Sequence, residues 1–291
     1  MEPGKSGNGT ATRIVCGVDG GPATPVIIDT ARWLAAAYNA QLVVAHAFDE
    51  AVLDAEQIMD EVRLRTAADR QVETRLVEGS PAERLLDIAD EEGAAFIVAG
   101  SRGRGAMASG VLGSVSRTLV RNANCPVVVV PPNSGEPTDA ADRDATIVCG
   151  VDGSDHALAA ARVARALAER LGYRVAVVHA PRSLKSMTYL GRSTTPSLSQ
   201  QPDQVARQSS EIVQAAVDLL GDRPSSAHIE AGPPAEVLES VAKEENGRLI
   251  VIAGRGTGTV QASLLGSVAL ELISSAEVPV VVLPEGAERE D

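Results

Sequence analysis

One short segment occurs twice in the sequence, and this repeat divides the chain into two halves of one kind. Residues 14–20 read Ile-Val-Cys-Gly-Val-Asp-Gly, and residues 147–153 repeat them without a change, 133 positions later. From residue 230 onward the halves correspond at an offset of 153, so that Pro279 repeats Pro126. In a chain of 291 residues, such a repeat predicts two similar domains, each with its own core.

A glycine-rich loop is the second feature that the halves share. In the first half an apolar run ends at Gly100, and the pattern Gly100-x2-Gly103-x9-Gly113-Ser114 leads into a helical pattern that reaches Arg121. Glycine lets a ligand approach the backbone closely, and the free N–H groups at a helix start attract phosphate. We therefore predict a strand–loop–helix unit that binds a phosphate, with a glycine-rich turn that binds no ligand as the alternative.

Short apolar runs alternate with helical patterns along each half, which is typical of a parallel sheet with helices on both faces. In the first half, strands are expected at residues 13–19, 41–47, 71–78, 94–99 and 126–130, and helices at 26–38, 49–69, from 81, and at 113–121. Ser-Pro-Ala-Glu at residues 80–83 predicts a helix start with a capping box. Ligands of such sheets bind beyond the carboxyl ends of the strands, so Asp19, Ala47 and Gly100 are expected to converge on one crevice.

The composition of the connecting segments predicts the domain boundaries. We expect a flexible N-terminus at 1–11, domains at 12–131 and 145–284, a linker at 132–144 and a flexible C-terminus at 285–291. The offset between the halves grows by 20 residues after His179, and the insertion is expected at 181–202, a segment rich in Ser, Thr, Pro and Gln. We expect a flexible surface loop there, with a lid over the ligand crevice as the alternative.

Composition and charge argue against several classes of partner. The formal net charge is −13, aromatic residues make up 2%, and no basic tract is present, so nucleic acid is not expected as a partner. No apolar stretch approaches the roughly 18–20 residues of a membrane span, and residues 1–10 lack a signal-peptide core, which predicts a cytoplasmic protein without a membrane partner. Cys16, Cys125 and Cys149 form no CxxC pair and are expected to be buried free thiols, with no metal site.

Taken together, these motifs resemble the universal stress protein family in its tandem two-domain form. The resemblance rests on the Val-Asp-Gly strand end, the strand that ends in His, the G-x2-G-x9-G-S loop and the final Pro-Val-Val-Val-Val-Pro strand. It implies an α/β fold of two Rossmann-like (adenine-nucleotide alpha hydrolase-like) domains, each a five-stranded parallel sheet of order 3-2-1-4-5 with helices on both faces. It also implies an intramolecular pseudo-dimer in which residues 126–130 and 279–283 lie side by side, with a further homodimer left open.

The resemblance also assigns a ligand, ATP with or without Mg²⁺, and its contacts. Asp19 would meet the ribose or the adenine, and the backbone of Ala47 the adenine. The phosphates would lie against Gly100, Gly103, Gly113, Ser114, Val115 and Ser116. Arg102 and Arg104 are candidates for the phosphate charge, with solvated loop arginines as the alternative. The matching residues of the second half are Asp152, Ala180, Gly256, Gly266, Ser267 and Val268.

The second copy of the loop departs from the first at two positions. Ala253 stands where the first motif glycine would be, and Ala269 stands where Ser116 would be. A methyl group near the phosphates and the loss of one hydroxyl, about 1 kcal/mol at most, predict weaker nucleotide binding in the second half.

The function implied is that of a non-catalytic, ATP-binding regulator of the stress response. His46 and His179, at matching strand ends, are expected to pack and hydrogen-bond rather than transfer protons, because no nucleophile accompanies them. Two alternatives stay open: a slow enzyme that hydrolyses ATP or transfers its adenylyl group, and an interaction scaffold that binds no nucleotide.

Overall fold

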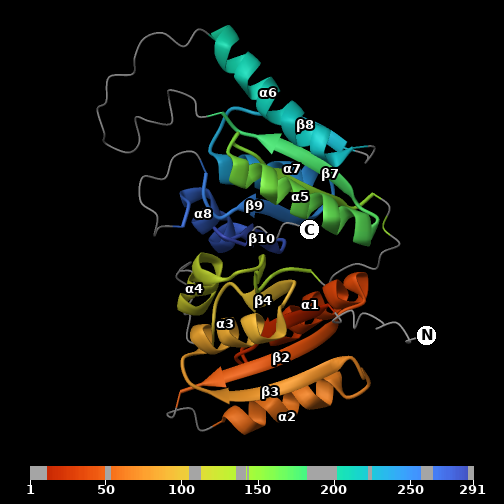
Figure 1. Ribbon diagram of the computed structural model, residues 1–291, viewed down its shortest axis with the longest axis vertical. Helices are drawn as coiled ribbons and strands as arrows, with labels where there is room; N and C mark the ends of the chain where they lie inside the picture. Colours follow the sequence, from red (N-terminus) through yellow and green to blue (C-terminus); the bar gives the residue numbers. More distant parts are fainter. Residues whose placement is uncertain are drawn as a thin grey trace, which may run out of the picture.

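Strands rich in Val and Ile alternate with helices along the whole described chain (Figure 1). The computed structural model describes residues 12–49, 54–104, 113–135, 142, 144–181, 202–221, 225–256 and 265–287. The first half consists of β1 (Arg13–Gly17), α1 (Thr24–Tyr38), β2 (Gln41–Phe48), α2 (Ala55–Thr66), β3 (Val72–Glu78), α3 (Pro81–Glu92), β4 (Phe96–Gly100), α4 (Ser114–Asn122) and β5 (Val127–Val130). The second half consists of β6 (Thr146–Gly150), α5 (Asp155–Leu171), β7 (Arg174–His179), α6 (Pro202–Leu220), β8 (Ser225–Ile229), α7 (Pro234–Glu244), β9 (Gly247–Ala253), α8 (Ser267–Ser275) and β10 (Val280–Leu283).

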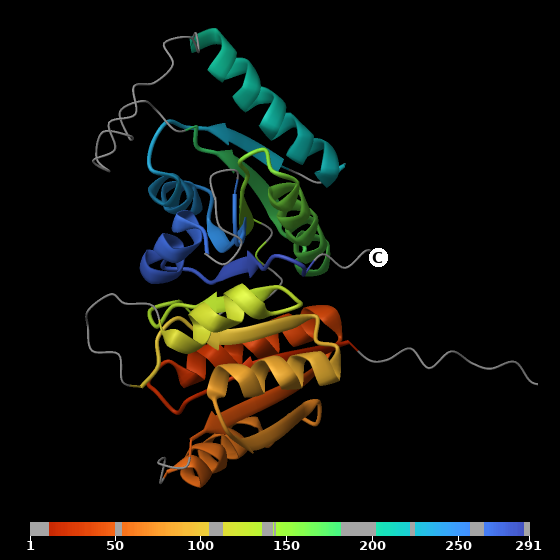
Figure 2. The same ribbon diagram turned by 60° about the vertical axis from the view of Figure 1, so that its left-hand side comes forward.

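All of these strands belong to one sheet, in the order β3-β2-β1-β4-β5-β10-β9-β6-β7-β8. Neighbouring strands within each half are parallel, as the sequence predicted. The halves meet where β5 pairs antiparallel with β10, so that Val128 lies opposite Val281. The two halves therefore stack along the long axis of the molecule, with β5 and β10 at their junction (Figures 1 and 2).

The elements expected in the first half are present, but one local prediction is wrong. Helix α3 begins at Pro81 as expected, yet the side chain of Ser80 forms no capping hydrogen bond, so the predicted capping box is absent. The first turn is instead closed by the backbone, with the N–H of Arg84 donating to the carbonyl of Ser80 at 2.9 Å. In α5, by contrast, the N-cap side chain is used, and the N–H of Ala157 donates to Ser154 Oγ at 3.1 Å.

The extra length of the second half is partly helical rather than entirely a loop. Helix α6 begins at Pro202 and has 19 residues, whereas α2 has 12. Residues 182–201 of the expected insertion lie outside the described residues, as do residues 1–11, most of the expected linker and residues 288–291. Asp142, near the end of the linker, accepts hydrogen bonds from Asn246 Nδ2 at 3.1 Å and Arg248 Nη2 at 2.9 Å.

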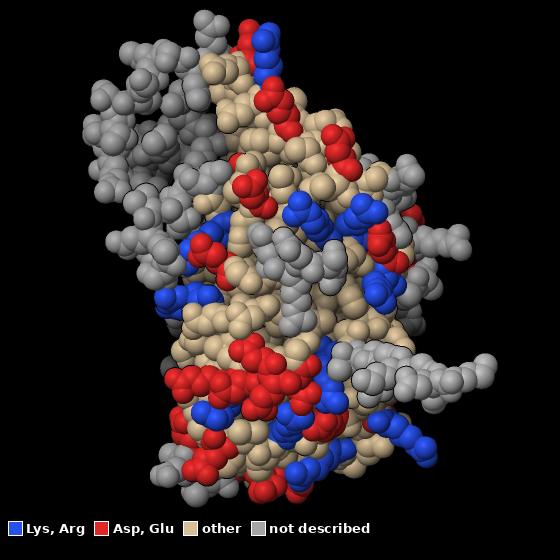
Figure 3. Space-filling model, viewed as in Figure 1, with Lys and Arg blue, Asp and Glu red and all other residues tan. Residues whose placement is uncertain are grey.

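Acidic side chains gather over the first half on the face seen in Figure 3, in the region where Figure 1 places α3. The sequence of α3 explains part of this concentration, because its residues include Glu83, Asp87, Asp90, Glu91 and Glu92. None of the described helices is both long enough and apolar enough to cross a membrane.

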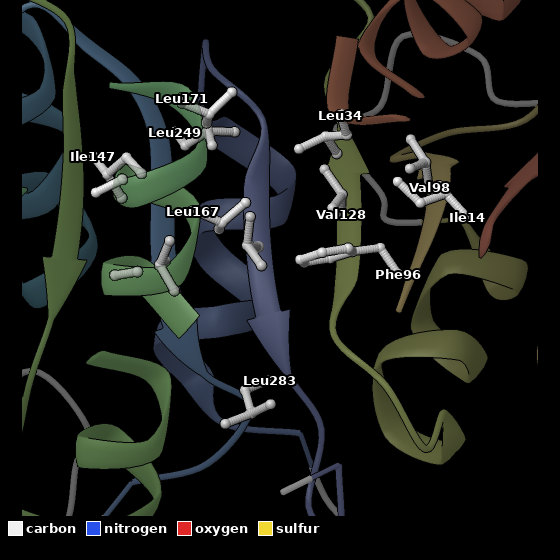
Figure 4. Packing of buried hydrophobic residues seen from close by; sticks show 14 of the residues in the cluster. Ile14, Leu34, Phe96, Val98, Val128, Ile147, Leu167, Leu171, Leu249 and Leu283 are labelled. Carbon is white, nitrogen blue, oxygen red and sulfur yellow. The ribbon is translucent and has the colours of Figure 1, made fainter. Parts of the chain in front are cut away.

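Two apolar cores, one on each face of the sheet, run through both halves. Side chains of α1 and α5, such as Leu34 and Leu167, belong to one core, and side chains of α3 and α7, such as Leu85 and Leu238, belong to the other. Figure 4 shows Leu34 and Val128 on one side of the junction, and Leu167 on the other. Because β5 and β10 are fully buried, the junction is part of the core rather than a contact between two surfaces.

The cysteines lie in these cores as free thiols, which confirms the prediction. Cys16 and Cys149 are fully buried, and Cys125 is buried as well. Burial in apolar surroundings raises the pKa of the Cys149 thiol to about 12, so this thiol stays protonated and unreactive near neutral pH.

Shortening a side chain at the junction should destabilise the whole molecule. Val281 is 0% exposed, and Val281→Ala is expected to lower the free energy of unfolding by about 2 kcal/mol, because a cavity remains where the methyl groups were. Leu64→Ala on α2 is the control, since Leu64 is 81% exposed and its truncation should change stability by less than about 0.5 kcal/mol. Urea denaturation followed by circular dichroism measures both, and equal effects would contradict the buried junction.

Candidate functional site

The first half contains a cavity of about 340 Å³ at the carboxyl ends of its strands. Its walls come from the ends of β1, β2 and β4 and from the starts of α3 and α4, segments that are distant in the sequence. The lining residues are Gly17, Val18, Asp19, Ile27, Ala47, Pro81, Leu85, Ala99, Gly100, Arg102, Gly103, Gly113, Ser114, Val115 and Ser116. The structure thus brings together every residue predicted for this site except Arg104, whose position is described below.

Asp19 is the acidic group of this cavity, and two backbone donors hold its carboxylate. The N–H of Gly21 donates to Oδ1 at 2.9 Å, and the N–H of Arg104 donates to Oδ2 at 2.6 Å. The second of these bonds joins the β4 loop to the end of β1. The carboxylate therefore has a fixed position beside the glycines of the loop.

The glycines of the loop leave space that a side chain would fill. A Cβ atom on Gly103 would lie 3.0 Å from Asp19 Oδ2, and one on Gly113 would lie 3.3 Å from the carbonyl oxygen of Ser101. Gly113 is also the N-cap residue of α4, and its N–H donates to Ser101 at 2.9 Å. The next N–H groups belong to the first turn of α4, which has no intrahelical acceptor for them, so they are suited to an anion in the cavity.

Three residues predicted to contact phosphate have protein partners. Ser116 is 1% exposed, and its Oγ lies 3.3 Å from the carbonyl of Ser101 and 3.2 Å from that of Gly113. Arg102 Nη2 donates to the carbonyl of Ser274, at the end of α8 in the other half, at 3.1 Å. Arg104 Nη2 pairs with Asp54 Oδ2 at 2.6 Å, and this hydrogen bond lowers the pKa of Asp54. These contacts stabilise the walls of the cavity.

A second cavity, of about 410 Å³, occupies the corresponding place in the second half. Its lining includes all the residues predicted there, namely Asp152, Ala180, Gly256, Gly266, Ser267 and Val268. Asp152 Oδ1 accepts hydrogen bonds from the N–H of Ser154 at 3.1 Å and from its Oγ at 2.6 Å. A Cβ atom on Gly256 would overlap Asp152 Oδ2, so a side chain there would force this carboxylate to move.

The alanine that replaces the first motif glycine is matched by a change in the opposing helix. A Cβ atom on Gly100 would lie 2.8 Å from Ile27 Cδ1. The residue equivalent to Ile27 in α5 is Ala160, because Asn39 and Gly172 end the two helices in the same left-handed conformation, 133 positions apart. The smaller side chain therefore leaves room for the methyl group of Ala253.

The histidines at the ends of β2 and β7 hold neighbouring strand ends together, as predicted. His46 Nδ1 lies 2.9 Å from the carbonyl of Val18, and His179 Nδ1 lies 2.8 Å from that of Val151. A carbonyl only accepts hydrogen bonds, so Nδ1 carries the proton in both rings. Val18 immediately precedes Asp19 and Val151 immediately precedes Asp152, so each bond fixes the turn that presents the aspartate of its own half.

The sequence interpretation missed the contribution of α6 to the second cavity. Val205, Gln208, Ser209 and Ile212 line it. Their spacing of three, four and seven positions is the signal that could have identified them, since it places all four on one face of a helix.

The sequence profile of the universal stress protein family matches residues 10–131 and 145–284. The chain belongs to the universal stress protein family. A universal stress protein of Mycobacterium tuberculosis is 34% identical over 217 residues, which cover 74% of this chain and 70% of that protein. Another from the same organism is 25% identical over 308 residues, covering 96% of this chain and 98% of that protein.

The solved structures agree with this assignment at the level of the fold. The crystal structure of a universal stress protein from Archaeoglobus fulgidus covers 94% of this chain with a TM-score of 0.63 and 18% sequence identity, and 98% of that chain is matched. The predicted α/β fold of tandem universal stress protein domains is therefore confirmed.

A double-mutant cycle can test whether a methyl group at residue 100 competes with the side chain of Ile27 for space. Gly100→Ala is expected to lower the free energy of unfolding by about 1–3 kcal/mol, because the new methyl group crowds Ile27 Cδ1. In an Ile27→Val background, which lacks that carbon, the same substitution should cost at least about 0.5 kcal/mol less. Urea denaturation of the four proteins measures this coupling, and additive costs would show that the two residues do not compete for space.

Proposed function

We propose that this universal stress protein binds ATP in both cavities and acts as a non-catalytic regulator of the stress response. The observation that carries the proposal is the first cavity, where Asp19, a glycine loop in which a Cβ at residue 103 would crowd the Asp19 carboxylate, and the start of α4 meet at the carboxyl ends of parallel strands. Such a crevice is where open α/β sheets bind their ligands, and a helix start supplies N–H groups to phosphate. Its volume of about 340 Å³ lies within the usual range of small-molecule sites.

The cavity has residues suited to each part of a nucleotide. The backbone of Ala47 would meet the adenine, Asp19 would meet the ribose or the adenine, and the α4 start from Gly113 to Ser116 would meet the phosphates. Since the side chains of Ser116 and Arg102 have protein partners, we assign phosphate binding to backbone N–H groups and to Ser114. A magnesium ion would be held mainly by the phosphates, because a single carboxylate makes a weak site.

The chemistry of the lining supports a binding role rather than catalysis. Among the described residues that line the first cavity, Asp19 and Arg102 are the only ionisable ones. The carboxylate of Asp19 accepts two backbone hydrogen bonds, and the guanidinium of Arg102 donates to the end of α8. Hydrolysis or adenylyl transfer needs a group that activates water or a nucleophile, and neither residue is placed to do so.

Charge and assembly favour a small nucleotide over a nucleic acid as the partner. The net charge of −13 and the acidic side chains over α3 (Figure 3) oppose binding of a phosphate backbone. The antiparallel pairing of β5 with β10 supports an internal pseudo-dimer, in which one chain supplies both halves. The free state of the three cysteines supports a reducing compartment, which we take to be the cytoplasm.

A side chain added at Gly103, in the glycine loop of the first half, should abolish nucleotide binding in that half. Gly103→Asp places a second carboxylate beside Asp19, at the expected position of the phosphates, so calorimetry with ATP should show one binding site fewer than in the wild type. Gly135→Asp is the matched control, because no heavy atom lies within 4 Å of a Cβ at Gly135 and both sites should remain. Unchanged binding by the Gly103→Asp protein would remove the loop from the site.

The nucleotide carried by the purified protein tests the regulatory role. We expect mass spectrometry of the supernatant after denaturation to show intact ATP, and no release of phosphate when the protein is incubated with ATP and Mg²⁺. Release of ADP or AMP with turnover would indicate an enzyme instead. A protein that binds no nucleotide even after ATP is added would be an interaction scaffold.

A further inference from the structure

Helices α2 and α6 occupy equivalent places in the two halves, and one contact fixes their register. A Cβ atom on Gly20 would lie 2.7 Å from Ile58 Cγ1, and one on Gly153 would lie 2.9 Å from Ile212 Cγ1. Both glycines follow the aspartate at the end of the first strand of their half. Ile58 and Ile212 are therefore equivalent, and each helix packs against the turn that presents the aspartate.

This register shows where the second half has additional structure. Ser209 of α6 is equivalent to Ala55, the first residue of α2, so the seven residues 202–208 extend α6 by about two further turns. The extension and the turn after it supply Val205, Gln208 and Ser209 to the lining of the second cavity. That cavity is the larger of the two, with about 410 Å³ against about 340 Å³.

Two polar side chains of this wall have no partner among the described residues. Ser209 is 3% exposed and lines the cavity, and no hydrogen bond joins its hydroxyl to another described residue, whereas the neighbouring Ser210 Oγ donates to the carbonyl of Ala206 at 3.0 Å. Gln208 is exposed and also lines the cavity, and its carboxamide has no hydrogen bond to another described residue either. Both residues line the cavity, so a ligand bound there can form hydrogen bonds with their polar groups.

The first half offers no such groups at the equivalent positions. Ala55 has no polar atom in its side chain, and the carboxylate of Asp54, the counterpart of Gln208, is paired with Arg104 at 2.6 Å. The difference between the halves is therefore chemical as well as one of size. The second cavity is lined by an amide and a hydroxyl at positions whose counterparts, Asp54 and Ala55, do not line the first cavity.

The position of these groups indicates which part of a nucleotide they would meet. Helix α6 packs against β7, β8 and α5, and β7 leads into Ala180. The proposed phosphate contacts, Gly266 and Ser267, lie instead at the start of α8. Under the proposed function, Ala180 meets the base, so the wall formed by α6 lies at the base end of the cavity.

We propose that Gln208 and Ser209 determine the base specificity of the second site, which takes a 6-aminopurine nucleotide. The inference rests on the proposed nucleotide binding. The carboxamide oxygen of Gln208 accepts a hydrogen bond from the exocyclic amino group, and its NH₂, with the hydroxyl of Ser209, donates to ring nitrogens. Glutamine is well matched to adenine because its amide presents an acceptor beside a donor. The first site, without these groups, distinguishes 6-aminopurines less.

The test compares ATP with purine riboside 5′-triphosphate, which lacks only the 6-amino group. Calorimetry is carried out on the full chain carrying Gly103→Asp, so that the second site is read alone. ATP should bind more tightly than the analogue, and Gln208→Leu should reduce this preference about tenfold, because a site built for an N–H group rejects ligands that lack it. Ser209→Ala, which installs the residue of the first half, should weaken binding of both nucleotides.

The control is Gln214→Leu, an exposed glutamine of the same helix that does not line the cavity, and it should leave the preference unchanged. An unchanged preference in the Gln208→Leu protein would overturn the inference while leaving nucleotide binding intact. If the Gly103→Asp protein binds neither nucleotide while the wild type binds ATP, the inference is also overturned, but the first site stands. If the wild type binds no nucleotide, both the proposed function and this inference are overturned.

Discussion

The antiparallel pairing of β5 with β10 is the interaction on which the rest of the structure depends. Each strand consists of four buried apolar residues, and either one alone would be an exposed apolar edge prone to aggregation. Pairing them removes both edges and makes the two apolar cores continuous across the chain. Around the junction, Trp33 lies 6.1 Å from Tyr173 between ring centroids, and Arg170 lies over the ring of Tyr38 at 4.9 Å.

The same junction brings the walls of the two cavities into contact. Helix α8 begins at the second cavity, where Ser267 and Val268 line it, and its last turn accepts the hydrogen bond from Arg102 of the first cavity. A guanidinium at the carboxyl end of a helix is favourable because unpaired carbonyls give that end a partial negative charge. One helix thus lines the second cavity with its start and binds a loop residue of the first cavity at its end.

The sequence predicted those features that depend on local pattern. Alternating apolar runs indicate the parallel strands, and the repeated Val-Asp-Gly and glycine loop indicate which strand ends converge, because strand direction alone determines where carboxyl ends lie. The partners of Ser116 and Arg102 could not be predicted, since they depend on how a loop packs against a distant helix. The contribution of α6 was missed for a related reason: a Ser-, Thr- and Pro-rich segment precedes it and obscures where the helix begins.

The effect of Ala253 depends on the side chain that packs against it as well as on its position in the glycine loop. Replacement of a motif glycine by Ala253 suggested a weakened site when the loop was considered alone. The equivalent of Ile27 is Ala160, however, so that the volume gained on the strand is lost on the helix, and cores tolerate changes that conserve volume. The hydroxyl missing at Ala269 is one that, in the first half, bonds to the loop backbone. The two cavities therefore differ less in the packing around the glycine loop than in the wall that α6 adds to the second cavity.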